Sequence, residues 1–441
     1  MPDIRPFRGL RFEPDSVGDL ANVVSPPYDV ISPAQQRTLL ARDPHNMVRL
    51  DLPADELGDE PDDRYRRAAR TFAAWRSDGS FRKDPRPGLY VYEQTYTVPG
   101  TAIERTQRGF FGRLRLEPFG PGSGVLPHER TLSGPKEDRY KLLRATGANF
   151  SPVVGLYADP SGDSARLLAR VAGTTPTVDL VDDDRVRHRL WVVPNDEAGG
   201  ESVHGLITAA GANPITIADG HHRYETALRY RDERRMSRSC EEDPPFDFLL
   251  TLFLDTTAEP LTVLPTHRVV RDLGETGLAS LWAGLDDLFE VDRIESSAAL
   301  VERFGGVGQN AGGAGRFGLW TRTGGAVLIA RRAAFTAHLP VGGEALRRLD
   351  VALLQVTFDR LCAIDPAATA AGGRVAYTKS AAEAVDWVDR GEDGADAAFL
   401  LEPTPVADIA AVAAAGDVMP QKSTYFYPKP VTGLVINPLE W

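Results

Sequence analysis

The feature that most constrains this chain is residues 217–225, where an apolar stretch runs through Asp219 and Gly220 into a helix start rich in histidine and arginine. Residues 213–218 predict a short strand, and residues 224–235 predict a helix. A strand that turns through a glycine straight into a helix exposes free backbone N–H groups and the positive end of the helix dipole. The segment therefore predicts an α/β fold with an anion site at this turn.

The side chains of this turn are the first candidate site residues. Gly220, His222 and Arg223 are predicted to hold phosphate oxygens, and Asp219 is predicted to hold a metal ion or a hydroxyl group. His221 is a candidate acid, and the sequence leaves open which of the two histidines faces the site. In the alternative interpretation, Asp219 caps the helix and the His-His-Arg turn lies in solvent. Cationic groups crowded at a positive helix terminus repel one another, which favours a bound anion.

A second group of candidates lies at residues 127–139. The adjacent His128 and Glu129 predict an acid/base pair, in which Glu129 is the candidate base. Lys136 and Arg139 predict contacts with phosphate oxygens. Charged loops before helices are common, so a solvated loop is the alternative interpretation.

Two further segments supply candidates for phosphate or nucleotide binding. His267 and Arg268 follow an apolar strand, where α/β proteins tend to place working residues, although a structural histidine fits equally well. Residues 422–429 combine cations, hydroxyl groups and aromatic rings, which suits base stacking or pocket closure, or an anchor for the terminus. The candidates in this tail are Lys422, Ser423 and Tyr425. The stiff turn at 25–29 suits a pocket wall or a plain rigid turn.

The order of predicted elements indicates an α+β (mixed α/β) fold, in a chain of 441 residues that is long enough for two or more domains of ~150 residues each. We expect an amino-terminal α/β segment at 1–104 and a core at 105–270 with an inserted lobe at 160–212. A carboxy-terminal α/β lobe at 271–441 is expected to send its tail back to the site. The main predicted elements are helices near 33–41, 62–77, 137–145, 275–288, 296–304, 345–362 and 406–416, and strands near 88–97, 106–116, 151–158, 246–254, 261–264, 316–321 and 326–332.

Composition narrows the function classes. The formal net charge of −12 disfavours a protein that grips nucleic-acid backbones, because such proteins carry a basic face. Cys240 and Cys362 are the only cysteines, which excludes a disulfide framework or a thiolate zinc cage. No apolar run approaches the ~18 residues that span a bilayer, and residues 1–20 do not read as a signal peptide. We therefore expect a cytoplasmic protein that does not act at a membrane.

The motifs in combination resemble the domain-of-unknown-function 1015 family over nearly the whole chain. The segments that carry the resemblance are Ser-Pro-Pro-Tyr-Asp (25–29), Pro-His-Glu-Arg-Thr (127–131), Lys-Glu-Asp-Arg (136–139), Asp-Gly-His-His-Arg-Tyr-Glu-Thr-Ala (219–227), Pro-Thr-His-Arg (265–268) and Lys-Ser-Thr-Tyr-Phe-Tyr-Pro-Lys (422–429).

A looser resemblance is to the ParB/sulfiredoxin-like superfamily, which includes free serine kinases and binds nucleotide phosphates at a similar strand-to-helix turn. Asp219, Gly220, His222 and Arg223 match that pattern. The resemblance implies a ParB/sulfiredoxin-like core in which Asp219 and Arg223 contact metal and phosphates and Glu129 accepts a proton from a substrate hydroxyl. The chain departs from a minimal domain of this kind in its size and in the ~90 residues between Glu129 and Asp219.

These observations lead to an expected function. We expect metal-assisted phosphoryl transfer to a small metabolite, with Mg²⁺ and a nucleotide such as ATP or ADP, because such transfer mainly needs positioning and charge neutralisation. The likeness to free serine kinases implies serine or a related hydroxyl compound as the acceptor. One alternative is a phosphatase acting on phosphoserine or a similar monoester, with His128 or His221 as the acid. Another is a nucleotide-sensing regulatory protein without turnover.

Overall fold

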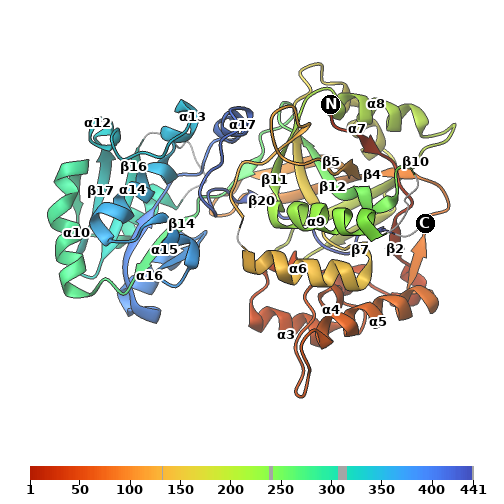
Figure 1. Cartoon of the computed structure of the whole chain (residues 1–441), viewed down its shortest axis with the longest axis horizontal. Coiled ribbons are helices and arrows are strands. Elements are labelled where there is room, and N and C mark those ends of the chain that lie inside the picture. The colour runs from red at the N-terminus through yellow and green to blue at the C-terminus, as the bar shows by residue number, and fades with distance from the viewer. Residues whose placement is uncertain (132, 238–241, 306–314, 440–441) are drawn as a thin grey trace.

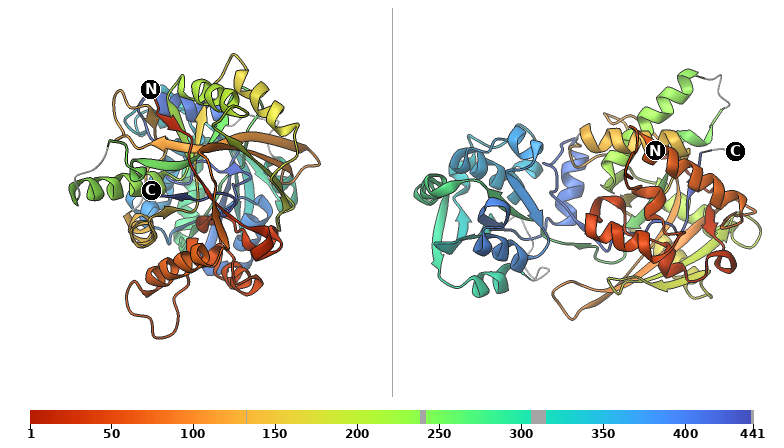
Figure 2. Two further views of the ribbon diagram at one scale, coloured as in Figure 1. Left: turned by 90° about the vertical axis from the view of Figure 1, so that its right-hand side faces the viewer. Right: turned by 90° about the horizontal axis from the view of Figure 1, so that it is seen from below.

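The computed structural model describes residues 1–131, 133–237, 242–305 and 315–439. Two lobes lie end to end, and both the first strand, β1 (Ile4–Arg5), and the last, β21 (Asn437–Pro438), belong to the larger lobe (Figures 1 and 2). Helices and strands alternate through both lobes, which confirms the predicted mixed α/β class.

The larger lobe is built around a mixed nine-stranded sheet. This sheet contains β1 and eight further strands, which are β4 (Gly88–Thr97), β5 (Glu104–Arg115), β6 (Val125–Leu126), β8 (Val153–Tyr157), β9 (Val178–Val181), β10 (Arg187–Pro194), β11 (Ile215–Asp219) and β12 (Phe248–Asp255). They run in the order β6-β11-β8-β12-β5-β4-β10-β9, with β1 paired to β5. Every residue of β12 is buried, because its near-continuous apolar run lies at the centre of the sheet. β12 pairs parallel to β8 and antiparallel to β5.

Helices stack in successive layers below this sheet. α9 (His221–Ser237) packs against α6 (Ser133–Thr146), and α6 packs against α5 (Asp63–Ser77) (Figure 1). The side chains predicted to form the apolar stripe of α5 are all buried, namely Tyr65, Ala68, Phe72 and Trp75. The shorter elements of the first 150 residues are β2 (Leu10–Phe12), α1 (Pro14–Val17), α2 (Leu20–Val23), α3 (Pro33–Arg42), α4 (Val48–Asp51), β3 (Phe81–Lys83) and β7 (Ala148–Asn149).

Residues 160–212, expected as an inserted lobe, contribute two strands to the large sheet. β10 pairs antiparallel with β4 over its whole length, and β9 pairs with β10 at the edge. The two helices of this segment, α7 (Asp163–Ala172) and α8 (Gly200–Gly211), pack against each other.

The smaller lobe is an antiparallel six-stranded sheet covered by helices on both faces. Its strands, in the order β15-β17-β16-β19-β14-β18, are β14 (His267–Arg271), β15 (Phe289–Ile294), β16 (Arg316–Thr321), β17 (Gly324–Ala330), β18 (Val375–Thr378) and β19 (Ala395–Leu400). One face packs on α10 (Gly274–Leu288) and α14 (Asp350–Cys362), and the other packs on α11 (Ser297–Phe304) and α16 (Ala381–Arg390). Short helices α12 (Arg332–Phe335), α13 (Glu344–Arg347) and α15 (Pro366–Ala371) complete the lobe.

The two lobes share one apolar core. The same buried cluster contains Leu252 of β12, Phe399 of β19 and Ile409 of α17 (Val406–Ala414), the helix that lies between the lobes (Figure 1). After α17 the chain returns to the larger lobe, where β20 (Phe426–Tyr427) pairs with β13 (Thr262–Val263) and β21 pairs with β7. The carboxy-terminal tail therefore crosses the junction between the lobes.

Most predicted elements agree with the structure within a few residues, including the alanine-rich helix near 406–416, which is α17. One difference concerns His267 and Arg268. They open β14 instead of ending the preceding apolar strand, because β13 stops at Val263 and Pro265 interrupts the chain before the next strand begins. The loop predicted at 305–315 lies largely outside the described residues. No helix within the described parts of the chain is long and apolar enough to cross a membrane.

Candidate functional site

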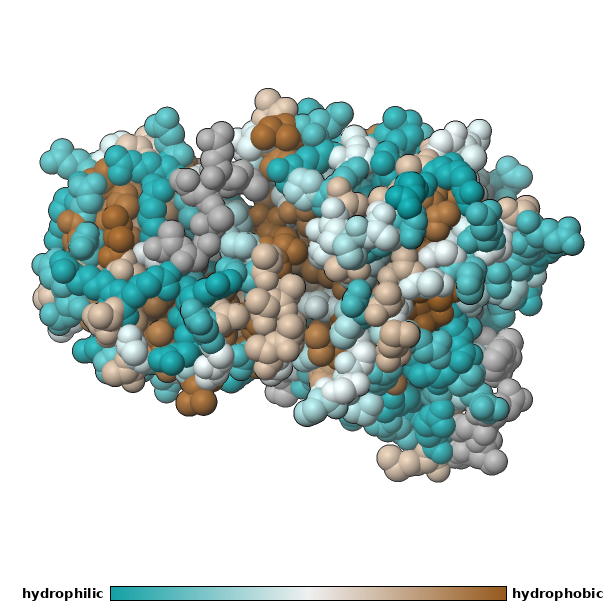
Figure 3. Space-filling view, turned by 90° about the horizontal axis from the view of Figure 1, so that it is seen from above, coloured by the Kyte–Doolittle hydropathy of each residue, from teal (hydrophilic) through white to brown (hydrophobic). Residues whose placement is uncertain are grey.

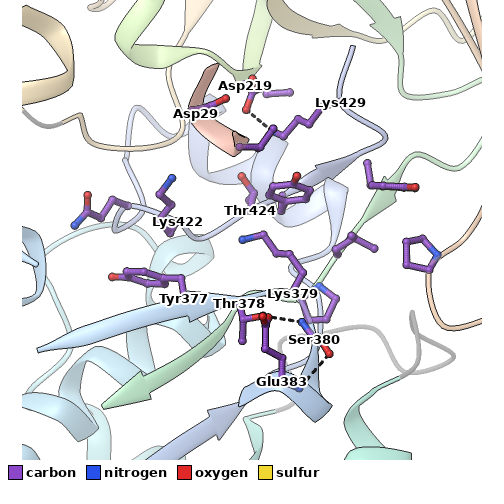
Figure 4. Close-up of a pocket in the computed structure, with 18 of the residues that line it drawn as sticks. Asp29, Asp219, Tyr377, Thr378, Lys379, Ser380, Glu383, Lys422, Thr424 and Lys429 are labelled. Carbon is purple, nitrogen blue, oxygen red and sulfur yellow. Dashed lines mark hydrogen bonds and ion pairs between the residues drawn. The ribbon is translucent and has the colours of Figure 1, made fainter. Parts of the chain in front are cut away.

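A cavity of about 1070 Å³ lies between the two lobes. The surface is hollowed where the lobes meet, and apolar residues line this hollow (Figure 3). Three parts of the chain contribute charged and polar side chains to the cavity wall, and Figure 4 looks into it. From the larger lobe come Tyr28, Asp29, Glu129, Asp219, His221 and His222; from the smaller lobe come Tyr377, Thr378, Lys379, Ser380 and Glu383; from the tail come Lys422, Thr424, Tyr425, Tyr427 and Lys429.

The turn at Gly220 has the strand-to-helix geometry that the sequence predicts. β11 ends at Asp219, α9 begins at His221, and Gly220 between them has a φ of +92°. A side chain there would be strained, and a Cβ atom would come within 3.0 Å of Arg223 Nε and 3.1 Å of Val153 Cγ2. Glycine is therefore required for the chain to turn this tightly.

Asp219 is held by two cations. Its Oδ2 accepts a hydrogen bond from Arg223 Nη2 at 2.5 Å, and its Oδ1 accepts one from Lys429 Nζ. Burial pushes the pKa of this carboxyl upward, but Lys429 and Arg223 together hold it well below its usual range. Asp219 is therefore ionised and neutralised within the protein.

Arg223 faces the protein interior. It is buried, it donates a second hydrogen bond from Nη1 to the carbonyl of Pro152, and it is not part of the cavity wall. Its guanidinium group lies 6.0 Å from the ring centre of Tyr28. The geometry thus gives Arg223 the task of fixing Asp219 and the turn, while His222 from the same turn reaches the wall.

The donor set at Asp219 does not fit a resident metal ion. Both carboxylate oxygens already accept hydrogen bonds from cations. Mg²⁺ prefers carboxylate, carbonyl and water oxygens in octahedral arrangement. In the described parts of the chain, no group of three or more His, Cys, Asp or Glu side chains could hold a metal.

His128 and His221 form a buried pair beside the turn. Their rings meet edge to face with centres 4.6 Å apart, and His221 Nε2 accepts a hydrogen bond from the backbone N–H of His128 at 3.2 Å. His128 Nδ1 bonds to the carbonyl of Ile217, and its Nε2 lies 3.0 Å from Thr424 Oγ1. Burial lowers the pKa of His128 to about 4 and that of His221 well below its ordinary value. Both imidazoles are therefore neutral near pH 7, and both His221 and His222 reach the cavity wall.

Glu129 lies in the same cavity as Asp219, although ~90 residues separate them in the chain. A parallel bridge pairs Glu129 with Met419, so the tail fixes the position of the glutamate. Desolvation raises the pKa of Glu129 to about 7, with a small further upward contribution from Asp219. The backbone N–H groups of Lys422 and Ser423 and the charge of Lys422 act on this pKa in the opposite direction. A carboxyl group poised near neutral pH suits proton transfer.

Lys136 and Arg139, predicted to hold phosphates, are placed away from the cavity wall. Lys136 Nζ pairs with Glu225 at 2.7 Å. Arg139 is buried, pairs with Asp138 at 2.5 Å, and lies 3.9 Å from the ring centre of Tyr28. Its contact with this cavity residue is a packing contact, so it positions the wall instead of facing a ligand.

His267 and Arg268 are also behind the wall. His267 Nδ1 accepts a hydrogen bond from the backbone N–H of Leu401 at 3.1 Å, and burial lowers its pKa to about 3. Arg268 donates to the carbonyl of Thr266 at 2.5 Å and to that of Lys422 at 3.2 Å. These contacts tie the tail to the smaller lobe.

The tail residues divide between the wall and the interior. Lys422 and Tyr425 line the cavity, whereas Ser423 is buried and donates to the carbonyl of Pro420 at 2.5 Å. Lys429, the last residue of the tail motif at 422–429, supplies the second partner of Asp219. The motif at 422–429 includes this lysine, so the sequence could have indicated it as a site residue.

Lys379 of the smaller lobe is a cavity residue that the sequence analysis does not single out. It follows β18 and precedes α16, so it sits at a strand-to-helix turn like that of Gly220. The same pattern of apolar strand, polar turn and capped helix could have identified it, since Ser380 caps α16 by accepting from the backbone N–H of Glu383. Lys379 extends into the cavity toward the tail (Figure 4).

The sequence matches the family described as protein of unknown function (DUF1015) over residues 4–352. This range covers more than half of the chain, so the protein belongs to that family. No curated protein matches the chain.

Several solved structures resemble the chain weakly. A conserved hypothetical protein from Pyrococcus furiosus is 15% identical, with 70% of this chain and 92% of that one covered and a TM-score of 0.33. A free serine kinase variant in complex with AMP is 13% identical, with 75% and 90% covered and a TM-score of 0.36. SbnI with a C-terminal truncation from Staphylococcus aureus is 10% identical, with 72% and 84% covered and a TM-score of 0.35. Scores at this level do not establish a shared activity.

Proposed function

We propose that the protein transfers a phosphoryl group from a nucleotide such as ATP or ADP to the hydroxyl group of a small metabolite, with serine or a related compound as the acceptor to test first. The observation that carries this proposal is Glu129. Its carboxyl group, with a pKa raised to about 7 by burial, faces a cavity that also presents three lysines. A base poised near neutral pH beside concentrated positive charge is what transfer to a hydroxyl requires.

In the proposed step, Glu129 accepts the proton of the acceptor hydroxyl. The hydroxyl oxygen forms a bond to the terminal phosphorus of the donor while the bond from that phosphorus to the bridging oxygen breaks. The shortened nucleotide leaves with the negative charge that develops on its bridging oxygen. Ammonium groups that line the cavity stabilise this charge because they are fixed before the reaction begins.

The cavity also has surfaces for the rest of a nucleotide. The rings of Tyr28, Tyr377, Tyr425 and Tyr427 contribute to its wall, and aromatic rings stack on bases. The residues at Asp219 do not fit a resident metal ion. We therefore expect Mg²⁺ to enter the cavity bound to the phosphates of the donor.

A phosphatase has less support from the site. That alternative uses His128 or His221 as a general acid, but burial lowers the pKa of both, so neither carries a proton to give near pH 7. A nucleotide sensor would use the same cavity without turnover, and product analysis separates it from a kinase.

The test is a search for products with the purified full-length chain. The protein is incubated with ATP, ADP or CTP and with serine or other small hydroxyl compounds, with and without Mg²⁺, and phosphorus NMR follows the phosphate groups. We expect a new phosphate-ester signal that requires both nucleotide and acceptor. Release of inorganic phosphate from phosphoserine without a nucleotide would favour the phosphatase. Nucleotide binding with no product from any combination would overturn the kinase in favour of the sensor.

A further inference from the structure

Lysine is rare in this chain, and its distribution is uneven. The sequence holds six lysines among 50 lysines and arginines, and three of the six, Lys379, Lys422 and Lys429, line the cavity between the lobes. Arginine stays charged under all ordinary conditions, whereas the lysine ammonium is a compact charge whose pKa shifts readily when it is buried. Most cations of the chain are therefore arginines, whereas the cavity contains lysines, which lose a proton more readily than arginines do.

Two of the three lysines lie against the same aromatic ring. Lys379 Nζ lies 4.4 Å from the ring centre of Tyr425, and Lys429 Nζ lies 4.6 Å from the same point. The lysines come from separate parts of the chain, since Lys379 belongs to the smaller lobe and the other two belong to the tail. Cation–π contact holds the ammonium groups but does not neutralise them.

The three lysines differ in their ion-pair partners. Lys429 pairs with Asp219, which Arg223 already shares. Among the described residues, neither Lys379 nor Lys422 takes part in an ion pair. Both ammonium groups face the cavity without a directly bonded carboxylate among these described residues, and the wall also carries the carboxyl groups of Asp29 and Glu129. The cavity has room for a ligand of many atoms.

The surroundings of Lys379 lower its affinity for a proton. Desolvation lowers the pKa of Lys379 to about 7, and the neighbouring Lys422, Lys429 and Arg268 act in the same direction, while Asp29 opposes them. The phenol of Tyr425 stays protonated near neutral pH, because burial raises its pKa. An anion that entered the cluster would reverse the balance and raise the pKa of Lys379, so that binding would charge it.

We propose that Lys379, Lys422 and Lys429 form a binding site for a chain of linked phosphates, and that Lys379 takes up a proton when the chain binds. Two unpaired ammonium groups and a third that is only shared call for a ligand with at least two negative charges spread over several oxygens. A phosphate chain meets that need, whereas a single carboxylate carries one charge on two oxygens. For the identity of the natural ligand, the di- or triphosphate of a nucleotide, this inference rests on the proposed function.

The test is isothermal titration calorimetry of the full-length chain with inorganic triphosphate at pH 7, repeated in two buffers of different ionisation enthalpy. We expect binding of triphosphate to be much tighter than binding of orthophosphate, and the apparent enthalpy to differ between the buffers because a proton is taken up. Affinity should fall as the pH rises from 7 to 9. Equal binding of orthophosphate, or no binding of triphosphate, would overturn the proposal.

Variants separate a ligand contact from a structural role. Lys379→Met should weaken triphosphate binding about tenfold or more, since hydrogen bonds to charged groups contribute strongly to affinity. Lys379→Arg should retain most of the affinity but lose the proton uptake, because arginine is charged before the ligand arrives. The matched control is Lys141→Met, which removes a lysine that pairs with Asp62 away from the cavity. Equal weakening by Lys141→Met, or proton uptake that survives Lys379→Arg, would contradict the assignment.

The same measurements keep this inference apart from the proposed function. Glu129→Gln should slow transfer by about a thousandfold and leave triphosphate binding intact. If triphosphate binds as described but no acceptor is ever phosphorylated, the proposed function fails and the lysine site stands. If transfer occurs while Lys379→Met leaves the KM for the nucleotide unchanged, the lysine site fails alone.

Discussion

Two groups of charged side chains meet at the cavity, and they differ in what balances them. At the turn between β11 and α9, Asp219 pairs with both Arg223 and Lys429. In the smaller lobe and the tail, Lys379 and Lys422 have no ion-pair partner among the described residues. A charge that is paired inside the protein is costly to separate from its partner, whereas a charge that faces a cavity is available to a ligand.

This difference in pairing shows that a residue of a suitable type does not always face the ligand site. The turn at 219–223 carries the residue types of a phosphate site, and the structure places its arginine behind the wall with a carboxylate partner. Lys379 is not among the residues that the sequence predicts for phosphate binding, yet its side chain, like that of Lys422, points into the cavity (Figure 4). A residue type indicates a capability, and its partners decide whether a ligand can use it.

The largest expected effect concerns the reaction itself. Replacing Glu129 by glutamine removes the proposed base while keeping its shape, so the rate of transfer should fall by about a thousandfold. Nucleotide binding should survive in this variant, because the lysines of the cavity, and not Glu129, are expected to hold the phosphates. Steady-state rates and calorimetry on the same preparation check both parts. Loss of binding together with turnover would indicate that Glu129 supports the cavity and is not the base.

The next effect concerns stability at the balanced group. Asp219→Asn leaves Arg223 and Lys429 without their shared carboxylate, and removing one partner of a buried ion pair costs about 3 kcal/mol. Urea denaturation should report this loss. The matched control is Asp62→Asn, whose side chain is 44% exposed and pairs with Lys141, and for which we expect a loss of about 1 kcal/mol or less. Similar losses in both variants would remove the distinction between the two groups.

A smaller effect should appear in the pH dependence of transfer. Burial raises the pKa of Glu129 to about 7, so the group is protonated and inactive as a base at pH 6 and ionised at pH 8. At saturating nucleotide, kcat should therefore rise about tenfold over this range. A profile that is flat across pH 6 to 8 in the wild type would exclude Glu129 as the group that limits the rate.

The smallest effect is expected for Lys136. This lysine pairs with Glu225 and lies outside the cavity wall, so Lys136→Met should weaken nucleotide binding by about twofold or less. Calorimetry on Lys136→Met and Lys379→Met under the same conditions measures both effects. A stronger effect from Lys136 than from Lys379 would return the phosphate site to the residues that the sequence favours.

Much of the fold could be predicted because local patterns determine it. The apolar run of β12 and the helical spacing of Tyr65, Ala68, Phe72 and Trp75 each predict an element that the structure contains. The place of residues 160–212 is harder to predict from the sequence, because no local pattern shows that β10 pairs with β4. That strand lies about 100 residues earlier in the chain.

The candidate site could be predicted in part. Asp219, His221, His222, Glu129, Lys422 and Tyr425 all line the cavity, and their residue types and motifs mark them. Four other candidates of equally suggestive type are bonded inside the protein. Backbone carbonyls accept from Arg139, Arg223 and Arg268, and the backbone N–H of Leu401 donates to His267. The strand-to-helix turn marks Lys379 locally, but its approach to the tail depends on how the smaller lobe packs.

A crystal structure of the full-length chain grown with ADP would show directly which cations contact the phosphates. We predict that the phosphates lie in the cavity between the lobes, with their oxygens within hydrogen-bond distance of Lys379 and Lys422, and that Arg223 still pairs with Asp219. Phosphates bound to a displaced Arg223, with Lys379 and Lys422 out of contact, would show that the lysines do not form the phosphate site.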